Sequence, residues 1–486
     1  MFLKAGVLSL ALLLASRLLG LARESAQAAA FGASGLADVV VLMLTLPDWL
    51  TGVLASGALS YVLVPAWSPM SRPQVQATQR RVAWALLALG GVIAIALVTL
   101  RVSAVRWLAG GIAPAMQPAA SAALVWSALA IPAALLASLW ATRLQHERDF
   151  TGMYAANLVV NVVLVAAIVV SATRGRVDVL TWLGTGLLAA MLARLAWLRW
   201  RMPVDAEPPS AQHPASHGLP ASSVWMWAVL SAGLPLALPF AARSMASQGG
   251  EGALAVFNYA WKLVELPLIL AIQLVATLAF PAIAKALSAN DAAALRSAVR
   301  RSIALGWTLA AAAAAALLVA APSIAQLLFG WGRMDAASLA RVAAWGAIAA
   351  WGLLPQSLIA VAVTVLAAQR RLGAAALAYL GGLALLLASS LWGAPDGAML
   401  MLLLDVIFAG IALALLRALG SQVREWMPWR SMVLPLLCVL AAAAAAHAST
   451  WDWGRWWGLF IAVLVAMAVI ALAWWRSADL REALAR

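Results

Sequence analysis

The stretch that decides the fold is residues 22–65, ARESAQAAAFGASGLADVVVLMLTLPDWLTGVLASGALSYVLVP. Part of it recurs later in the chain at a fixed distance. Ala22-Arg23 reappears as Ala242-Arg243, and Leu46-Pro47 reappears as Leu266-Pro267, each 220 residues further on. The equal spacing indicates two similar halves of about 220 residues, followed by a C-terminal addition.

The composition is that of a membrane protein. Of the 486 residues, 65% are apolar and 10% are charged, and the mean hydropathy is +0.95. A soluble domain has about 25% charged residues, so this chain has too few to cover a solvated surface. The single cysteine, Cys438, and the four scattered histidines form no disulfide framework, metal-ligand spacing or catalytic triad pattern.

Apolar runs long enough to span a bilayer occur along the whole chain. A spanning helix needs about 20 mostly apolar residues, and about fourteen candidates meet this requirement. They are residues 3–22, 36–66, 82–100, 121–142, 151–172, 178–198, 224–246, 254–284, 302–326, 338–368, 372–393, 397–416, 431–450 and 456–475. Pro47 and Pro267 are expected to break the second and eighth spans at matching places, and broken helices usually line a cavity or pack against protein.

The basic residues set the expected topology. Most of the 32 Lys and Arg residues, Arg194, Arg199 and Arg201 among them, fall at the ends of spans on the side that carries both termini. By the positive-inside rule, both termini are therefore cytoplasmic. The same rule accounts for the net charge of +14 without a nucleic-acid partner.

The predicted organisation is an all-α polytopic membrane protein with two parallel six-helix lobes and a C-terminal helix pair. Residues 1–200 form the N-terminal lobe, and residues 201–223, rich in Pro, Ser and His, form a cytoplasmic linker. Residues 224–420 form the C-terminal lobe, and residues 421–486 form the helix pair with a short cytoplasmic tail. Parallel repeats of this kind are a transporter architecture with the substrate site near mid-membrane.

Charged residues inside the spans are the candidate site, because they are costly in lipid. Lys262 and Glu265 are three residues apart, share a helix face and are expected to pair. The alternative is that the charges are interfacial anchors or internal ion pairs. The full set is Arg17, Arg23, Asp38 and Asp48 in the first half, and Arg243, Lys262, Glu265 and Asp405 in the second.

The chemistry of this set points to an anionic ligand. Arginine presents a planar fork that matches phosphate oxygens in pairs, so several cations are suited to hold a pyrophosphate-linked head group. Acidic partners would orient the cations and weaken their grip enough for release. Asn157, Asn161 and Gln273 add uncharged hydrogen-bonding groups, for which the alternative is bonding between helices.

Several motifs resemble those of one family. The opening Ala15–Glu24, ASRLLGLARE, is similar to the first-helix signature of the MurJ/MviN lipid II flippases. The resemblance continues in order through further short motifs and covers essentially the whole chain. These are Phe31-Gly32-Ala33, Ala37-Asp38, Leu46-Pro47, Gly57-Ala58-Leu59-Ser60, Val64-Pro65, and Tyr259-Ala260-Trp261-Lys262-Leu263 with Glu265-Leu266-Pro267.

The resemblance implies a fold of the multidrug/oligosaccharidyl-lipid/polysaccharide exporter superfamily. It implies two lobes around a central cationic cavity, and a groove for the polyprenyl tail at the last two helices. Arg17, Arg23 and Asp38 match the family's functional cavity residues, and Lys262 stands where the family usually has Arg. This chain departs from the family at Thr51, Gly52 and Ser56, where a basic pair and an acidic residue are usual, so one cavity arginine is absent and the exact saccharide stays open.

The resulting functional hypothesis is a flippase of the bacterial inner membrane. It carries an undecaprenyl-pyrophosphate-linked saccharide, with lipid II first among the choices, from the cytoplasmic to the periplasmic leaflet by alternating access. Arg17, Arg23 and Lys262, with Arg243, are assigned to binding the head group, and Asp38 and Glu265 to orienting these cations. No Gly-x-x-x-x-Gly-Lys-Ser/Thr run occurs.

The expected partners follow from this hypothesis. They are the lipid-linked saccharide and membrane lipids, with the chain acting as a monomer and without nucleic acid. No cofactor is expected, and a coupling cation such as sodium or a proton is left open as the driving force.

Other functions remain open from the sequence. A flippase for an exopolysaccharide or O-antigen repeat unit is the nearest alternative, favoured by the missing arginine at Gly52. A drug antiporter of the same fold that exports cations would be expected to have fewer arginines in its cavity. A polyprenyl-linked glycosyltransferase or ligase would need acid/base or metal-binding groups on a sizeable extracytoplasmic loop. A scaffold of a cell-wall complex would tolerate substitution of the cavity residues.

Overall fold

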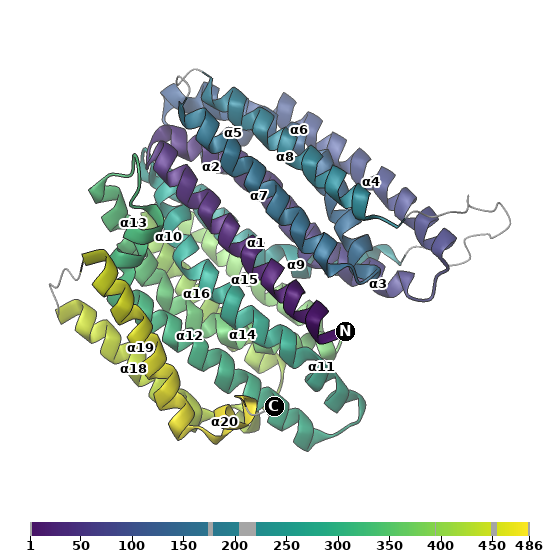
Figure 1. The fold of residues 1–486 in the computed structure, drawn as a ribbon. Helices are drawn as coiled ribbons and strands as arrows, with labels where there is room; N and C mark the ends of the chain where they lie inside the picture. The colour runs from purple at the N-terminus through teal and green to yellow at the C-terminus, as the bar shows by residue number, and fades with distance from the viewer. Residues whose placement is uncertain (1, 174–177, 204–219, 394, 449–453, 485–486) are drawn as a thin grey trace. The chain divides into compact units, whose positions relative to one another are not determined.

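The computed structural model describes residues 2–173, 178–203, 220–393, 395–448 and 454–484. Throughout these ranges the regular structure is helical and no strand occurs (Figure 1). The predicted all-α fold class is confirmed. Most of the predicted linker, residues 204–219, lies outside the described residues.

The chain divides into two compact units. Unit 1 comprises residues 1–240 together with 250–255, and unit 2 comprises residues 241–249 and 256–486. The helices that begin in unit 1 are α1 (Phe2–Phe31), α2 (Gly35–Val53), α3 (Leu59–Trp67), α4 (Arg72–Thr99), α5 (Arg101–Ala109), α6 (Gln117–His146), α7 (Phe150–Thr173), α8 (Val179–Arg201), α9 (Ser222–Ala246) and α10 (Ala253–Pro267). The lobe boundaries expected from the sequence remain a prediction.

The helices that begin in unit 2 include the longest in the described chain. They are α11 (Leu274–Ser288), α12 (Ala292–Phe329), α13 (Ala336–Ala349), α14 (Leu353–Ala368), α15 (Leu372–Ser389), α16 (Gly397–Ala418), α17 (Val423–Trp426), α18 (Trp429–Ala448), α19 (Gly454–Arg476) and α20 (Ala478–Leu484). Within this unit α12 packs against α14, α18 and α19.

Twelve helices among the described residues are long and apolar enough to cross a membrane. Two further spans expected from the sequence coincide with α1 and with the pair α10 and α11. α1 carries Arg17, Arg23 and Glu24, and α10 and α11 are each 15 residues long. The chain is therefore a multi-pass membrane protein, and fourteen is an approximate count of its spans.

Two π-helical segments interrupt spans at related places. η1 (Leu54–Ala58) separates α2 from α3, and η4 (Leu268–Gln273) separates α10 from α11. In the second case the break follows Pro267 directly, as expected. In the first case α2 runs through Pro47 without interruption and the break comes at Leu54, so the position predicted for it was wrong. A proline within a helix removes one hydrogen bond and favours irregular turns nearby.

Two helix-to-helix turns repeat the same backbone device. α6 is followed by Arg148 at φ 61°, and α14 is followed by Arg370 at φ 58°. Next to them, the amides of Asp149 and Arg371 donate to carbonyl oxygens five residues earlier, at 2.8 Å in both cases. This is the hydrogen bond that closes a helix when the chain turns left-handed. The turn after α11 has the same device, with Asn290 at φ 50° and the amide of Asp291 donating to the carbonyl oxygen of Ala286, so it marks helix ends generally and is not specific to the repeat.

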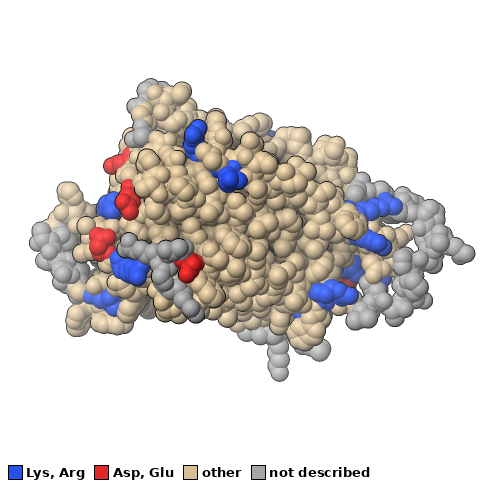
Figure 2. Space-filling model, turned by 90° about the horizontal axis from the view of Figure 1, so that it is seen from above, with Lys and Arg blue, Asp and Glu red and all other residues tan. Residues whose placement is uncertain are grey.

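Uncharged residues make up most of the surface visible in Figure 2, with few Lys, Arg, Asp or Glu side chains. Many large apolar side chains are exposed, and Ile95 on α4 and Leu278 on α11 are 66% and 71% accessible. Exposed apolar side chains on this scale mark a surface that contacts lipid.

Candidate functional site

Arg23 is the centre of the charged cluster in unit 1. Its residue is 8% exposed on α1. The guanidinium Nη2 donates to Glu24 Oε1 at 3.0 Å and to Asp48 Oδ2, on α2, at 2.9 Å. Its Nε is buried and has no hydrogen-bond partner among the described residues. Arg23, one of the predicted site cations, therefore binds two carboxylates, and its Nε–H has no acceptor among the described residues.

A second arginine lies within electrostatic range of the same carboxylate. Arg194 on α8 is 4% exposed, and Asp48 is the acidic side chain whose charge acts on it. No hydrogen bond or ion pair joins it to any described residue, and its Nε is buried without a partner. The sequence placed Arg194 with the basic residues at the end of its span. Its distance from that end, seven residues before Arg201, was the signal that it lies within the membrane.

Asp38 binds the backbone at a helix start rather than the cluster of cations. Its residue is 2% exposed. Its carboxylate accepts hydrogen bonds from the amides of Gly252, at 2.7 Å, and Ala255, at 2.8 Å. The first amide directly precedes α10 and the second lies in its first turn, where unpaired N–H groups and the positive dipole end attract an anion. The orienting role expected for Asp38 towards the arginines has no contact in the described structure to support it.

The contact at α10 is reciprocated. Glu251, just before α10, accepts a hydrogen bond from the amide of Gly35, the first residue of α2, at 2.9 Å. Ser34 caps the same helix by accepting from Ala37 N. Glu251 was missed from the sequence, because an acidic residue directly before a helix start suggests a cap of that helix, whereas Glu251 caps α2, 216 residues away.

Two of the four second-half residues, Lys262 and Glu265, lie on α10, whereas Arg243 lies on α9 and Asp405 on α16. Lys262 Nζ and Glu265 Oε2 are 2.6 Å apart, which is the ion pair expected from their spacing. Both side chains are partly exposed, at 21% and 28%. Arg243, on α9, has a buried Nε without a hydrogen-bond partner in the described part of the chain.

Arg17 stands apart from the buried cluster. It is exposed on α1 and lies within electrostatic range of Tyr154 on α7. Nearer the cluster, Gly20 of α1 faces the side-chain amide of Asn161 on α7. The polar residues expected on the fifth span therefore face α1 in part, and Asn157 is exposed.

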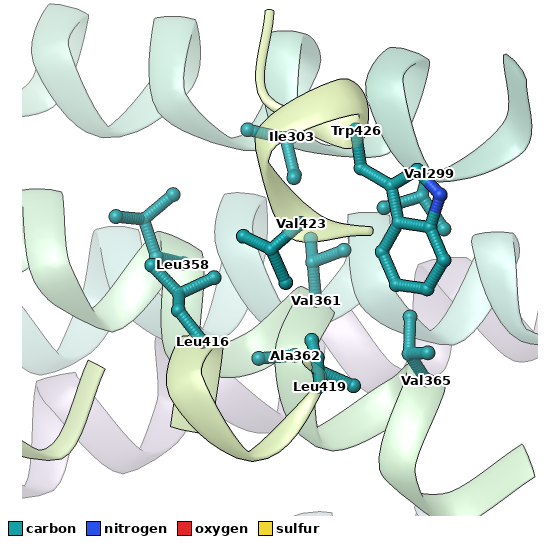
Figure 3. A pocket seen from close by; sticks show the side chains of 10 residues that line it. All are labelled: Val299, Ile303, Leu358, Val361, Ala362, Val365, Leu416, Leu419, Val423 and Trp426. Carbon is teal, nitrogen blue, oxygen red and sulfur yellow. The ribbon is translucent and has the colours of Figure 1, made fainter. Parts of the chain in front are cut away.

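Unit 2 also contains a small apolar pocket between α12, α14, α16 and α17 (Figure 3). Val299, Ile303, Leu358, Val365 and Trp426 are among its lining residues, and its volume is about 10 Å³. A site of this size holds at most one water molecule, so it is not a substrate cavity. In the described ranges no group of three or more His, Cys, Asp or Glu residues is placed to hold a metal ion.

The protein-family comparison matches nearly the whole chain. The family model "Lipid II flippase MurJ" matches residues 27–477. A lipid II flippase MurJ from Burkholderia cenocepacia is 27% identical over 362 residues, which is 70% of this chain and 68% of that protein.

Solved structures share the fold. A lipid II flippase MurJ in an inward closed conformation matches with a TM-score of 0.76 and 15% identity, over 96% of this chain and 98% of that chain. An inward-facing multidrug resistance MATE family transporter of the MOP superfamily matches with a TM-score of 0.64 and 13% identity, over 88% and 96%. With the family model covering most of its length, the chain belongs to the lipid II flippase MurJ family of peptidoglycan biosynthesis, and it is a multi-pass membrane transporter rather than an enzyme.

Proposed function

We propose that this chain carries the undecaprenyl-pyrophosphate-linked peptidoglycan precursor lipid II from the cytoplasmic to the periplasmic leaflet of the bacterial inner membrane. The family match over residues 27–477 carries this proposal. In it, transport proceeds by alternating access, both termini are cytoplasmic, and the chain acts as a monomer. The lipid tail stays in the membrane while the head group crosses.

The charged cluster of unit 1 supports an anionic head group. Arg23 is buried and binds two carboxylates, so it already sits in a site that stabilises charge-assisted hydrogen bonds. Phosphate oxygens compete for the same donors. The proposal assigns head-group binding to Arg17, Arg23, Arg243 and Lys262, with Glu265 holding Lys262 in place.

The acidic partners also make release possible. A cation that bound phosphate without competition would hold it too tightly for rapid turnover, because charge-assisted bonds in a low-dielectric site are strong. Asp48 returns to Arg23 as the phosphate leaves, while Glu24 stays beside it. The carboxylates therefore lower the affinity in a way that suits transport.

One position of the sequence favours a second class of substrate. Gly52, where the family motif usually has a basic residue, faces the apolar Leu236 side chain of α9, 3.1 Å from where a Cβ would stand. The site thus has one cation fewer at this position. A lipid-linked repeat unit of an exopolysaccharide or O-antigen is the alternative cargo that this difference favours.

Complementation tests the proposed function. A bacterium depleted of its own lipid II flippase receives this chain, and growth and access of lipid II to an external probe are measured. The parent chain is expected to restore both, whereas Arg23→Ala and Lys262→Ala, expressed to the same level, are expected to fail. If a well-expressed parent restores neither, the lipid II assignment is wrong, and rescue of an O-antigen flippase mutant decides for the alternative.

A further inference from the structure

Arg23, Arg194, Glu24 and Asp48 form a cluster of four charges that are paired unevenly. Arg23 contacts both acids of the cluster, Glu24 at 3.0 Å and Asp48 at 2.9 Å. Arg194 has neither an ion pair nor a hydrogen bond with any described residue, although its residue is 4% exposed. The cluster holds two cations and two anions, yet one cation has both partners and the other has none.

Arg194 cannot relieve this imbalance by losing its proton. Arginine stays charged in proteins, and an unpaired charge inside a membrane protein is costly. Its low exposure also shows that the side chain is enclosed by protein and is not free to bind water at the surface. Arg199, one turn further along α8, is exposed and needs no such partner.

Asp48 contacts Arg23 and lies within electrostatic range of Arg194. Its Oδ2 binds Arg23, its side chain is 45% exposed, and its charge reaches Arg194. The side chain is therefore not locked by packing. A change of Asp48 rotamer towards Arg194 would give each arginine one carboxylate, with Glu24 remaining on Arg23.

We propose that Arg194 is the second partner of Asp48, and that Asp48 moves from Arg23 to Arg194 when a pyrophosphate-type anion occupies Arg23. Arg194 is then a positioning residue, because it acts on the ligand through Asp48. The inference rests on the proposed function, since it takes the anion to be the pyrophosphate of a lipid-linked saccharide.

The exchange has a simple energetic logic. A phosphate oxygen that binds Arg23 displaces Asp48, and a displaced carboxylate without a partner would oppose binding. Arg194 supplies that partner, so the displaced carboxylate keeps an ion pair, and Arg23 meets the ligand with one acidic partner, Glu24, in place of two. When the ligand leaves, Asp48 returns from Arg194 to Arg23. The cluster therefore has two arrangements, and ligand binding shifts the population from one to the other.

The test is a double-mutant cycle on the full-length protein in detergent. Equilibrium dialysis measures binding of radiolabelled inorganic pyrophosphate to the parent, Arg194→Gln, Asp48→Asn and the double variant. Arg199→Gln, on the same helix, controls for the loss of one positive charge. Arg194→Lys keeps a charge at the position and tests whether a cation there is enough.

The exchange predicts a specific pattern. Arg194→Gln leaves Asp48 on Arg23 and weakens pyrophosphate binding by about tenfold, the size of one coupled charge pair. In the Asp48→Asn background the same substitution changes binding by less than about twofold, because no carboxylate needs to be received. Arg199→Gln binds as the parent does, and Arg194→Lys recovers most of the affinity.

Two results overturn the exchange. If Arg194→Gln weakens binding equally in both backgrounds, Arg194 contacts the ligand itself or only supports the fold. If the parent binds no pyrophosphate, the cluster is not a pyrophosphate site. Lipid II access in the complementation strain separates these failures from failure of the proposed function. If the parent restores access but the double-mutant cycle shows no coupling between Arg194 and Asp48, the exchange is wrong and the proposed function stands.

Discussion

Asp38 and Glu251 cap each other's helices. Asp38, in the first turn of α2, accepts the amides of Gly252 and Ala255 at the start of α10. Glu251, directly before α10, accepts the amide of Gly35 at the start of α2. Each carboxylate satisfies N–H groups that have no partner within their own helix and lies at the positive end of the helix dipole. The two helix starts are therefore fixed to one another within unit 1.

Loss of the Asp38 carboxylate is expected to destabilise the protein strongly. Asp38→Ala leaves two buried amides without acceptors and should lower the free energy of unfolding by about 2–3 kcal/mol. Asp335→Ala is the matched control, because Asp335 caps α13 through Ser338 N from an exposed position. It should cost about 1 kcal/mol. Denaturant unfolding in detergent compares them, and equal losses would contradict the buried double cap.

The turn between the two caps depends on Gly252. Gly252 has φ +78°, and a Cβ there would overlap the carbonyl oxygen of Ala33. Gly250 also has a positive φ, +99°, but open space around it. Gly250→Ala should cost about 1–2 kcal/mol from the backbone alone, and Gly252→Ala should cost clearly more. Thermal unfolding midpoints measure the difference, and a Gly252→Ala protein as stable as Gly250→Ala would show that the close approach is absent.

The Lys262–Glu265 pair allows effects on stability to be distinguished from effects on transport. In the swapped variant Lys262→Glu/Glu265→Lys the 2.6 Å ion pair can re-form with its charges exchanged. We expect thermal stability close to that of the parent, since a partly exposed pair contributes about 1 kcal/mol or less. Lipid II access should nevertheless be lost, because an acid then stands where the head group meets a cation. Full transport by the swapped variant would show that Lys262 does not bind the head group.

An ion pair outside the spans predicts an acid-dependent loss of stability. Asp149, in the turn between α6 and α7, accepts two hydrogen bonds from Arg201, at 2.9 and 2.8 Å, and one from the amide of Gly152. Burial raises the pKa of Asp149, but the bonds from Arg201 and Gly152 and the guanidinium charge outweigh burial and hold the pKa below its ordinary value of 3.8.

The sign of the pH effect follows from that direction. A carboxylate with a lowered pKa in the folded protein stabilises it above the unfolded pKa, and this stability is lost as the pH falls through the folded value. Unfolding midpoints measured from pH 6 down to pH 3 should therefore fall less steeply below about pH 4 in Asp149→Asn than in the parent. Identical slopes would mean that the pair does not couple to folding.

The sequence was sufficient for the helical architecture and for the local ion pair. Apolar runs of bilayer length and the absence of a solvated surface left few alternatives to a multi-pass helical fold. Lys262 and Glu265 were expected to pair because a spacing of three residues places them on one helix face. Both inferences depend only on periodicity along one segment.

The partners of the other site residues depend on how helices pack, which the sequence does not state. Asp38 was expected beside cations, but its acceptors face backbone amides 214 and 217 residues away. Arg194 was grouped with basic residues at a helix end because its depth in the span depends on where α8 stops. The break in the second span was predicted at Pro47, whereas the α-helix gives way to a π-helical segment seven residues later, at Leu54.

Transport of lipid II in purified vesicles tests the central claim most directly. The parent, Arg23→Ala and the control Arg199→Ala are reconstituted with lipid II, and the rate at which lipid II becomes accessible to an enzyme on the other side is measured. The account predicts movement by the parent and the control, and a rate at least about tenfold lower for Arg23→Ala, the loss expected from one charge-assisted contact. A parent that moves no lipid II, or an Arg23→Ala variant that moves it as fast as the parent, would contradict the account.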